Sequence, residues 1–359
     1  MRIITTFILT CSFLISSCDF KSTTNNDIVF NRSDFEEVIL LKNADTVSIN
    51  EALNPLFFYV LRDSLVLVQN RDDSQLFKAG IYSLKTGEIV KEIAPKGLGP
   101  NEFVSCQILV KQNSDSIFYL DDVVQNKYRA FNVDSVLSHA RYYPKSFDYP
   151  RNLVCLDFVD STRYVGYNYW HLEHPKFNNS VQALDYYNID LPTEQSNLNN
   201  MKYFVANVTG GHTFYESKKK QIWVANFYDD KIDIYNDSLK LKTTLSGPDH
   251  FERKFSTFEE EKMKSVGFEK GCSYMAYKSF CVVNNHVYLV YDGTHDIPFR
   301  SKNLNSIEVF KLDLSGKLLT LYKLDRYIYS ISVDSKEEYL YGTSCHSFEE
   351  TPLLVKYKL

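Results

Sequence analysis

The chain has 359 residues, with 40 basic and 45 acidic residues and a formal net charge of −5. Because both signs of charge are intermixed, no basic face is expected, which argues against nucleic acid as a partner. Aromatic residues make up 15% of the chain, with 26 Tyr and 25 Phe against 2 Trp, and β-branched residues recur beside them. This composition is typical of β-sheet.

Residues 1–17 are predicted to be a lipoprotein signal peptide. Arg2 supplies a short positive start, residues 3–15 form an apolar run, and small residues precede Cys18 as a cleavage site. A plain secretory signal, the alternative, has no use for a cysteine after the cut, whereas a lipoprotein signal uses its thiol as the acylated atom. We therefore expect a lipid on Cys18 to be the membrane contact, since no later apolar run approaches the roughly 18 residues of a membrane helix.

Residues 18–35 are predicted to be a flexible tether, because they are polar and rich in Asn, Ser and Thr. From residue 36 to residue 359 the chain is a succession of short strand signals separated by Asn, Asp, Gly and Ser turns. Examples are SLVLVQN at 64–70 and HVYLVYD at 286–292. Short strands at such spacing favour an all-β sandwich, barrel or propeller.

A repeat decides between these architectures. An aromatic residue in a short strand, followed by a polar turn and another strand, recurs at spacings of 49, 56, 48, 75 and 47 residues. Periods near 40–50 residues are those of four-stranded propeller blades, so each copy is predicted to be the third strand of a blade in a six-bladed β-propeller. The six aromatic residues are Tyr82, Phe131, Tyr187, Tyr235, Phe310 and Tyr357.

The sixth copy ends the chain, because Leu359 follows Tyr357 by two residues. A last blade of three strands would expose an unpaired edge and leave the ring open. The strand-like segment 36–50 has no repeat of its own. We predict that it pairs beside the C-terminal strand and closes the ring, which would attach the lipid tether to the closing blade.

The spacing of 75 residues contains an insertion. Residues 256–266 begin with Ser256 and carry Glu259 three residues later, a capping-box pattern that predicts a short helix between the fourth and fifth blades.

The segment KGLGPNEF at 96–103 follows the first blade. Its glycines and proline force a tight connection, and Phe103 is expected to re-enter the core as the chain crosses to the next blade. Weaker echoes occur at 144–147 and 247–251. A phosphate cradle is the alternative, but a strand follows the loop where such a cradle needs a helix.

Residues 96–103 resemble the glycine-glycine-proline-acid-aromatic loop of the TolB-like six-bladed β-propeller lipoproteins common in the Bacteroides group. Asn101 stands where the usual form has glycine. Through the repeat, the resemblance covers about residues 36–359. It implies the propeller fold and a cell-envelope location, for which we favour the outer membrane, and it implies no catalytic residues.

Polar clusters offer candidate metal chemistry. HLEH at 171–174 lacks the H-E-x-x-H pattern, so a solvated hairpin is favoured over a metal site. Acidic clusters occur at 121–122, at 229–230 and around Asp292. Their oxygens suit Ca²⁺ if a channel ion exists, but their places after apolar strands favour a structural role in hairpins. No metal ligand and no catalytic residue is assigned.

Candidate binding residues are Tyr167, Tyr169 and Trp170, with His295 in a later loop cluster. Flat aromatic faces suit sugar rings or peptides, and packing between blades is the alternative. We predict a non-enzymatic, lipid-anchored propeller that binds a protein or glycan partner without a cofactor. A cation-dependent hydrolase or lyase at the central channel mouth, using Ca²⁺, is the alternative function.

Five cysteines lie beyond Cys18, and an odd number argues against a planned disulfide framework. Buried thiols are favoured, and a Cys272 to Cys281 bridge stays open.

Overall fold

The structure is a computed structural model. It describes residues 26–49, 55, 57–70, 76–109, 116–125, 127–148, 153–159, 164–168, 181–184, 210–251, 255–260, 263–268, 273–295, 306–344 and 351–359.

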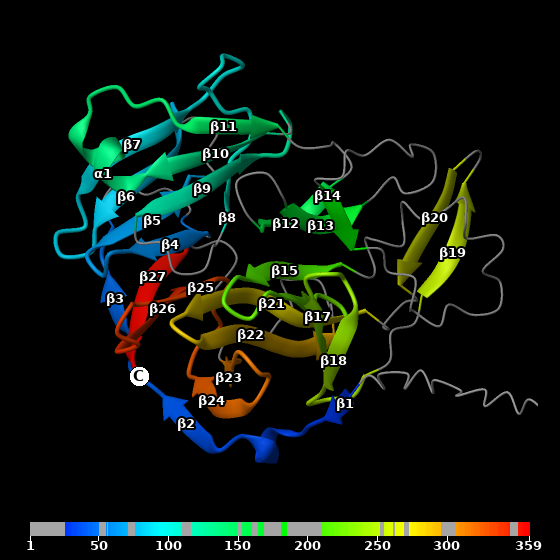
Figure 1. Cartoon of the computed structure of the whole chain (residues 1–359). Helices are drawn as coiled ribbons and strands as arrows, with labels where there is room; N and C mark the ends of the chain where they lie inside the picture. Colours follow the sequence, from blue (N-terminus) through cyan, green and yellow to red (C-terminus); the bar gives the residue numbers. More distant parts are fainter. Residues whose placement is uncertain are drawn as a thin grey trace, which may run out of the picture.

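The protein is an all-β propeller, as predicted (Figure 1). Among the described residues, five sheets have four or five strands. Two of them are built from β4 (Phe58–Leu61), β5 (Leu65–Gln69), β6 (Phe77–Ser83) and β7 (Ile89–Pro95), and from β8 (Gln107–Leu109), β9 (Ile117–Asp122), β10 (Lys127–Asn132) and β11 (Lys145–Asp148). The short helix α1 (Val133–Ser138) joins β10 to β11.

Three further sheets complete this set, and each takes a strand from the N-terminal segment. Their main strands are β15 (Gly211–Glu216), β16 (Gln221–Asn226), β17 (Lys231–Asn236) and β18 (Leu241–Ser246); β21 (Tyr274–Val283), β22 (His286–His295), β23 (Ile307–Asp313) and β24 (Leu318–Leu324); and β25 (Ile331–Val333), β26 (Tyr339–Ser344) and β27 (Leu353–Lys358). Five of the six repeat aromatics lie in the third strands of the five sheets, as predicted, namely Tyr82, Phe131, Tyr235, Phe310 and Tyr357.

The described residues do not show the expected sixth four-stranded blade. Where the third repeat falls, they show a three-stranded sheet of β12 (Leu153–Phe158), β13 (Tyr164–Asn168) and β14 (Val181–Leu184), and β13 pairs with β14 in parallel. The repeat aromatic of this copy, Tyr187, lies outside the described residues. The described part of the chain therefore contains five complete blades, this three-stranded sheet and one two-stranded sheet.

The first strands of five successive sheets, β12, β15, β21, β25 and β4, lie beside one another in that order. Side chains on several of these first strands accept hydrogen bonds from backbone amides of the first strand of the next sheet, which fixes the position of one sheet relative to the next. The joining hydrogen bonds run from the Tyr215 amide to Asp157 Oδ2 (2.6 Å), from the Ile331 amide to Ser279 Oγ (3.2 Å) and from the Val60 amide to Ser332 Oγ (3.1 Å).

The N-terminal segment supplies the fourth strand of the last blade, as predicted, because β3 (Asp45–Val47) pairs antiparallel with β27. It also does more. Strand β2 (Glu37–Leu41) adds in parallel to β24, and β1 (Asn26–Val29) adds in parallel to β18. We call residues 26–47 the N-terminal strap; it runs along the outer edges of three sheets (Figure 1, blue).

The strap corrects the predicted tether, since residues 26–35 belong to the folded domain. Between β1 and β2 lies a single 3-10 turn, η1 (Arg32–Asp34), flanked by two phenylalanines that are 2% and 6% exposed, Phe30 and Phe35. Their rings pack against each other and against Phe310, with centroids 5.1 to 6.2 Å apart. Burial of these two rings in the core gives an otherwise polar segment a fixed path.

The prediction of a helix at 256–266 is wrong. This segment forms a hairpin of β19 (Phe255–Glu260) and β20 (Met263–Phe268), with Thr257 directly opposite Val266. The capping-box pattern is only a local preference, and β-branched residues paired across two strands favour the hairpin.

The loop 96–103 is a crossover, as predicted. Phe103 is fully buried, and its amide donates to the Pro95 carbonyl at 2.8 Å. The echo at 247–251 also leaves a blade, because it follows β18, the outer of that sheet's four main strands, and precedes β19 in the chain. The echo at 144–147 does not: Phe147 lies in β11, at the outer edge of its sheet, where its ring stacks on Tyr128 at 4.6 Å.

Cys106 and Cys281 are free, buried thiols. The Cys272 to Cys281 bridge is therefore not formed, and burial raises the pKa of Cys281 to about 12. Within the part of the chain that the structure describes, no helix has the length and apolar character needed to cross a membrane.

Candidate functional site

The acidic pairs of the sequence serve to hold loops. Asp122 is fully buried and accepts hydrogen bonds from the Val104 amide at 2.8 Å and from Ser105 Oγ at 2.9 Å. Asp230 accepts from the amides of Asp249 and His250 in the crossover after β18. Among the residues that the structure describes, no group of three or more His, Cys, Asp or Glu side chains could hold a metal ion.

A different group of side chains comes together where the sheets of β21–β24 and β25–β27 meet. Lys278 Nζ lies 3.3 Å from Asp292 Oδ2, and the Tyr327 hydroxyl donates to the same oxygen at 2.6 Å. Lys278 also donates to the Tyr327 hydroxyl, and Nζ lies 4.7 Å from the ring centroid of Tyr327 and 5.9 Å from that of Tyr329. We call these four residues the Lys278 cluster.

The fold fixes this cluster from three directions. The pairing of β21 with β22 shifts register on both sides of Tyr277, and such irregularities re-aim the neighbouring side chains, here Lys278. Asp292 lies near the end of β22, and Tyr327 lies in the crossover to β25. That crossover is held by Ser344 Oγ, which donates to the Tyr327 carbonyl at 2.7 Å.

The cluster has the chemistry of a binding site. The Asp292 side chain is only 1% exposed and neutralises the Lys278 ammonium, whose side chain is 13% exposed. The Tyr327 ring is only 2% exposed, so Lys278 and the partly exposed Tyr329 are the members of the cluster that a ligand could reach, as a cation beside a flat aromatic face. Sugar rings and polar peptide segments present the complementary combination.

His212 on β15 borders the Lys278 cluster through the backbone. Burial lowers the pKa of His212 to about 4, and a hydrogen bond with the backbone of Lys278 only partly opposes this shift. The ring packs edge-on against Phe227, with centroids 4.6 Å apart, and its Nε2 is buried without a partner. His212 is therefore neutral at physiological pH, and its unpaired nitrogen is buried beside the cluster.

The predicted binding residues are not brought together by the described part of the chain. Tyr167 lies in β13, opposite Val154 and Leu184, and His295 ends β22 in another sheet. Only the backbone of these two residues is described, and Tyr169 and Trp170 lie outside the described residues, as does the HLEH segment at 171–174. The binding role of all four predicted residues stays a prediction.

Sequence reasoning named Asp292 only as part of an acidic cluster and missed its partners. Lys278, Asp292 and Tyr327 are separated by 14 and 35 residues along the chain. No local pattern marks residues that far apart, and the signal that could have found them is the repeat itself, which places β21, β22 and the crossover at one junction.

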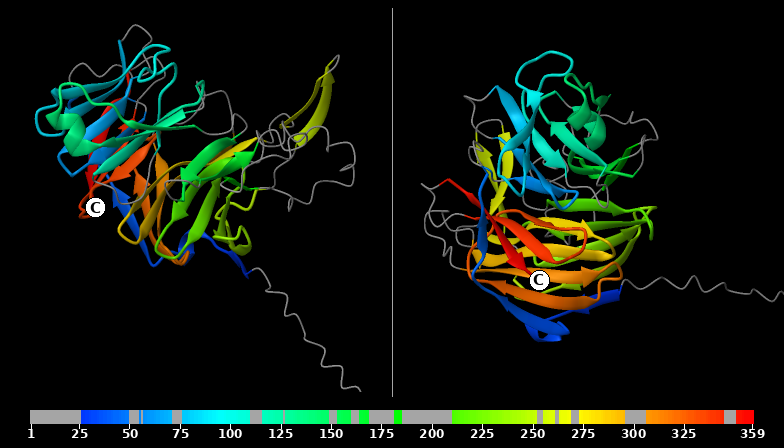
Figure 2. Two further views of the ribbon diagram at one scale, coloured as in Figure 1. Left: turned by 45° about the horizontal axis from the view of Figure 1, so that its top comes forward. Right: turned by 90° about the vertical axis from the view of Figure 1, so that its left-hand side faces the viewer.

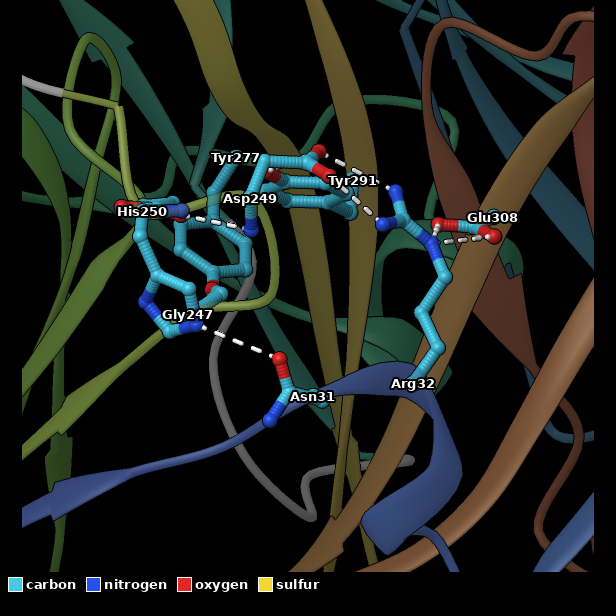
Figure 3. A network of polar contacts seen from close by, with 9 residues as sticks. Asn31, Arg32, Gly247, Asp249, His250, Tyr277, Tyr291 and Glu308 are labelled. Carbon is cyan, nitrogen blue, oxygen red and sulfur yellow. Dashed lines mark hydrogen bonds and ion pairs between the residues drawn. The ribbon is translucent and has the colours of Figure 1, made fainter.

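A second network fastens the strap and is drawn in Figure 3. The Arg32 guanidinium contacts both oxygens of Asp249, at 2.6 and 3.1 Å, and both oxygens of Glu308, at 2.9 and 2.8 Å. The Tyr291 hydroxyl donates to Asp249 at 2.9 Å, and His250 Nε2 lies 3.4 Å from Asn31 Oδ1. Paired, charge-assisted hydrogen bonds of this kind fix geometry as well as adding energy.

The comparison with family models agrees with the propeller architecture. A family model described as TolB-like 6-blade propeller-like matches residues 20–336. Among solved structures, a member of the DUF4221 family from Bacteroides vulgatus ATCC 8482 is 12% identical with a TM-score of 0.49, covering 88% of this chain and 96% of that one. A protein of Bacteroides fragilis NCTC 9343 that is described as exported is 12% identical with a TM-score of 0.47, covering 89% and 98%. No curated protein matches the chain.

Proposed function

The chain belongs to the family of TolB-like 6-blade propeller-like proteins, and from this premise we propose that it is a lipid-anchored binding propeller of the cell envelope. In this proposal Cys18 carries the lipid, the outer membrane is the site, and the propeller binds a protein or glycan partner without performing chemistry on it.

The observation that carries the anchoring proposal is the position of β1. The strand begins at Asn26, eight residues after Cys18, and continues directly into the strap. Eight residues span at most about 28 Å when fully extended. The lipid therefore holds the propeller close to the bilayer at the edge of the β15–β18 sheet. The sequence had suggested attachment at the closing blade instead.

Six blades are part of the proposal. The sheet of β12–β14 occupies the place of the third repeat, and Asp157 on β12 accepts a hydrogen bond from the Tyr215 amide of the next sheet. Val165 on β13 packs with Ile222 and Val224 of that same sheet. These are the contacts expected between neighbouring blades, and the family description also counts six.

The Lys278 cluster is the proposed binding surface. Lys356 provides a matched control elsewhere on the propeller, because its Nζ also lies near a carboxylate, Asp45 at 4.0 Å, and over a tyrosine ring, Tyr339 at 5.1 Å. A panel of defined glycans and peptides should be tested for binding to the parent protein, and ligands found there should bind more weakly to Lys278→Ala and equally well to Lys356→Ala.

Anchoring is tested separately by membrane fractionation. Cys18→Ala should move the protein from the membrane fraction to the soluble fraction. Retention of this variant in the membrane would contradict the lipid anchor, and equal binding by Lys278→Ala and the parent would contradict the binding surface.

A further inference from the structure

The outward side of the N-terminal strap carries exposed aliphatic side chains. Val29 on β1 is 67% exposed, and Val38 and Leu40 on β2 are 51% and 58% exposed. Ile28 is 44% exposed but lies on the other face of β1, because neighbouring residues of a strand point to opposite faces. On β2, Val38 and Leu40 alternate with Ile39 and Leu41, which are partly or fully buried. The strap therefore has one apolar side in the core and a second apolar side facing outwards.

The outer strands β3 and β11 do not share this pattern, and β7 exposes a single aliphatic residue, Val90, together with Glu92 and Pro95. The exposed positions of β11 are Lys145, Ser146 and Asp148, and those of β3 are Asp45 and Thr46. Polar and charged residues at such edges are the usual protection against unwanted contacts. The apolar outward side is thus a local property of β1 and β2, and exposed apolar groups that lie together commonly mark a contact surface.

The place of these strands indicates what they contact. Strands β1 and β2 are the outermost strands of two neighbouring sheets, and they follow one side of the propeller (Figure 2). Asn26, at the start of β1, is eight residues from Cys18. With a reach of at most about 28 Å, a lipid at Cys18 keeps this side nearer to the bilayer than any other part of the ring.

We propose that the outward side of β1 and β2 rests in the interfacial region of the lipid bilayer, with Val29, Val38 and Leu40 as its contact residues. This inference rests on the proposed lipid anchor at Cys18. The propeller then stands on its side, and the two openings of its channel face along the membrane.

The charges around the strap indicate that this contact is apolar rather than electrostatic. Arg32 is bound by Asp249 and Glu308, and Lys317 lies 2.5 Å from Glu36. Asp27 and Glu37 are exposed on the strap strands. With no excess of positive charge, the surface has little attraction for anionic lipids, so the contact should form on zwitterionic vesicles and should not weaken at high salt.

Tryptophan reporters test the contact in the lipidated full-length protein on phosphatidylcholine vesicles. Val38→Trp and Leu40→Trp place the reporter on β2. Val90→Trp is the matched control, because Val90 is 47% exposed on β7, the outer strand of a sheet that the strap does not join. Each variant is compared with the parent protein, whose own Trp170 and Trp223 set the baseline.

Vesicles containing lipids brominated in the acyl chains should quench and blue-shift the fluorescence of the two β2 reporters, at low and high salt, and should leave Val90→Trp at the parent baseline. Quenching of neither β2 reporter, or equal quenching of Val90→Trp, would overturn the inference. So would a blue shift of the β2 reporters that appears without vesicles and grows with protein concentration, because it would indicate a second copy of the chain on this side.

The anchor itself is read out independently by co-flotation of the protein with the vesicles. A protein that fails to float contradicts the lipid anchor, whereas a protein that floats with unquenched β2 reporters contradicts only the bilayer contact.

Discussion

The carbonyl oxygen of Phe30 lies 2.1 Å from the position that a Cβ atom on Gly247 would occupy. The Phe30 amide donates to the carbonyl of Ser246, the residue before Gly247, at 2.9 Å, which joins the strap to the crossover. The Gly247 amide is itself held by the Asp230 carbonyl, at 2.8 Å. Gly247 also has a φ of +147°. The N-terminal strap therefore passes over the crossover after β18 at a distance that only glycine permits.

Gly247→Ala should lower the free energy of unfolding by about 2 kcal/mol or more, because the new methyl group meets the Phe30 backbone and the left-handed φ is strained. Chemical unfolding of the Cys18→Ala background measures it. Gly316→Ala is the control, since Gly316 has a φ of +88° but its Cβ would meet only side-chain atoms, at 3.3 Å. Equal losses in the two variants would contradict the close approach of strap and crossover.

Arg32 is expected to hold the strap on the propeller. Arg32→Ala removes four hydrogen bonds to Asp249 and Glu308, and Arg32→Lys keeps the charge but loses the planar fork that makes them. Since the Arg32 side chain is 36% exposed, the loss of global stability should be modest, on the order of 1 kcal/mol. The larger effect should be local.

Hydrogen exchange of residues 26–35 should therefore become faster in both Arg32 variants, and more so in Arg32→Ala. Arg62→Ala is the comparison, because Arg62 contacts Asp134 at 2.6 Å but that carboxylate is 71% exposed. If exchange across residues 26–35 were unchanged in Arg32→Ala, the burial of Phe30 and Phe35 alone would hold the strap.

The parts of the fold that sequence predicted correctly depend on patterns that repeat or on a missing partner. Tyr82 and Phe310 were placed in third strands because each recurs within the same strand-turn-strand pattern. Strand β3 was placed beside β27 because a three-stranded last blade lacks an edge partner. Both arguments use the whole chain rather than one segment.

The errors arose where a segment's structure depends on distant residues. Phe30 and Phe35 are two aromatic residues in a polar stretch, and they hold the strap in place through contact with Phe310, some 280 residues away. The capping box at Ser256 was a local signal that strand pairing overrode. The Lys278 cluster was missed because its members are distant in sequence, and Tyr327 and Asp292 meet only in the folded protein.

His212 should make stability sensitive to mild acid. Its pKa is about 4 in the folded protein, against an ordinary value of 6.5, so below pH 6.5 the unfolded state binds the proton more strongly. The free energy of unfolding should therefore be constant above about pH 6.5 and should fall as the pH drops towards 4. His212→Phe fits among Phe227 and Phe280 and should flatten this part of the profile, whereas His139→Gln at an exposed position should leave it unchanged. An identical profile for His212→Phe and the parent would show that the histidine is not held neutral.

Glu337 should make stability depend on pH in a more acidic range, between pH 4.5 and pH 2. Burial opposes its charge, but hydrogen bonds from Lys311, Tyr288 and Asn284, together with His286, outweigh burial and lower the pKa of Glu337 to about 2 from 4.5. A lowered pKa means that the stabilisation is fully present above pH 4.5 and is lost as the pH falls towards 2.

Glu337→Gln should accordingly be less stable than the parent at pH 7, by about 1 to 2 kcal/mol once solvent screening of this side chain, which is 13% exposed, is taken into account. The difference should shrink below pH 4.5, because the unfolded parent then binds a proton that the folded protein binds only near pH 2. Glu338→Gln is the matched control, since the neighbouring side chain is exposed and should show little change at either pH. Unfolding curves at pH 7 and pH 3 measure both variants, and a difference between Glu337→Gln and the parent that is as large at pH 3 as at pH 7 would mean that the side chain acts through packing rather than through its charge.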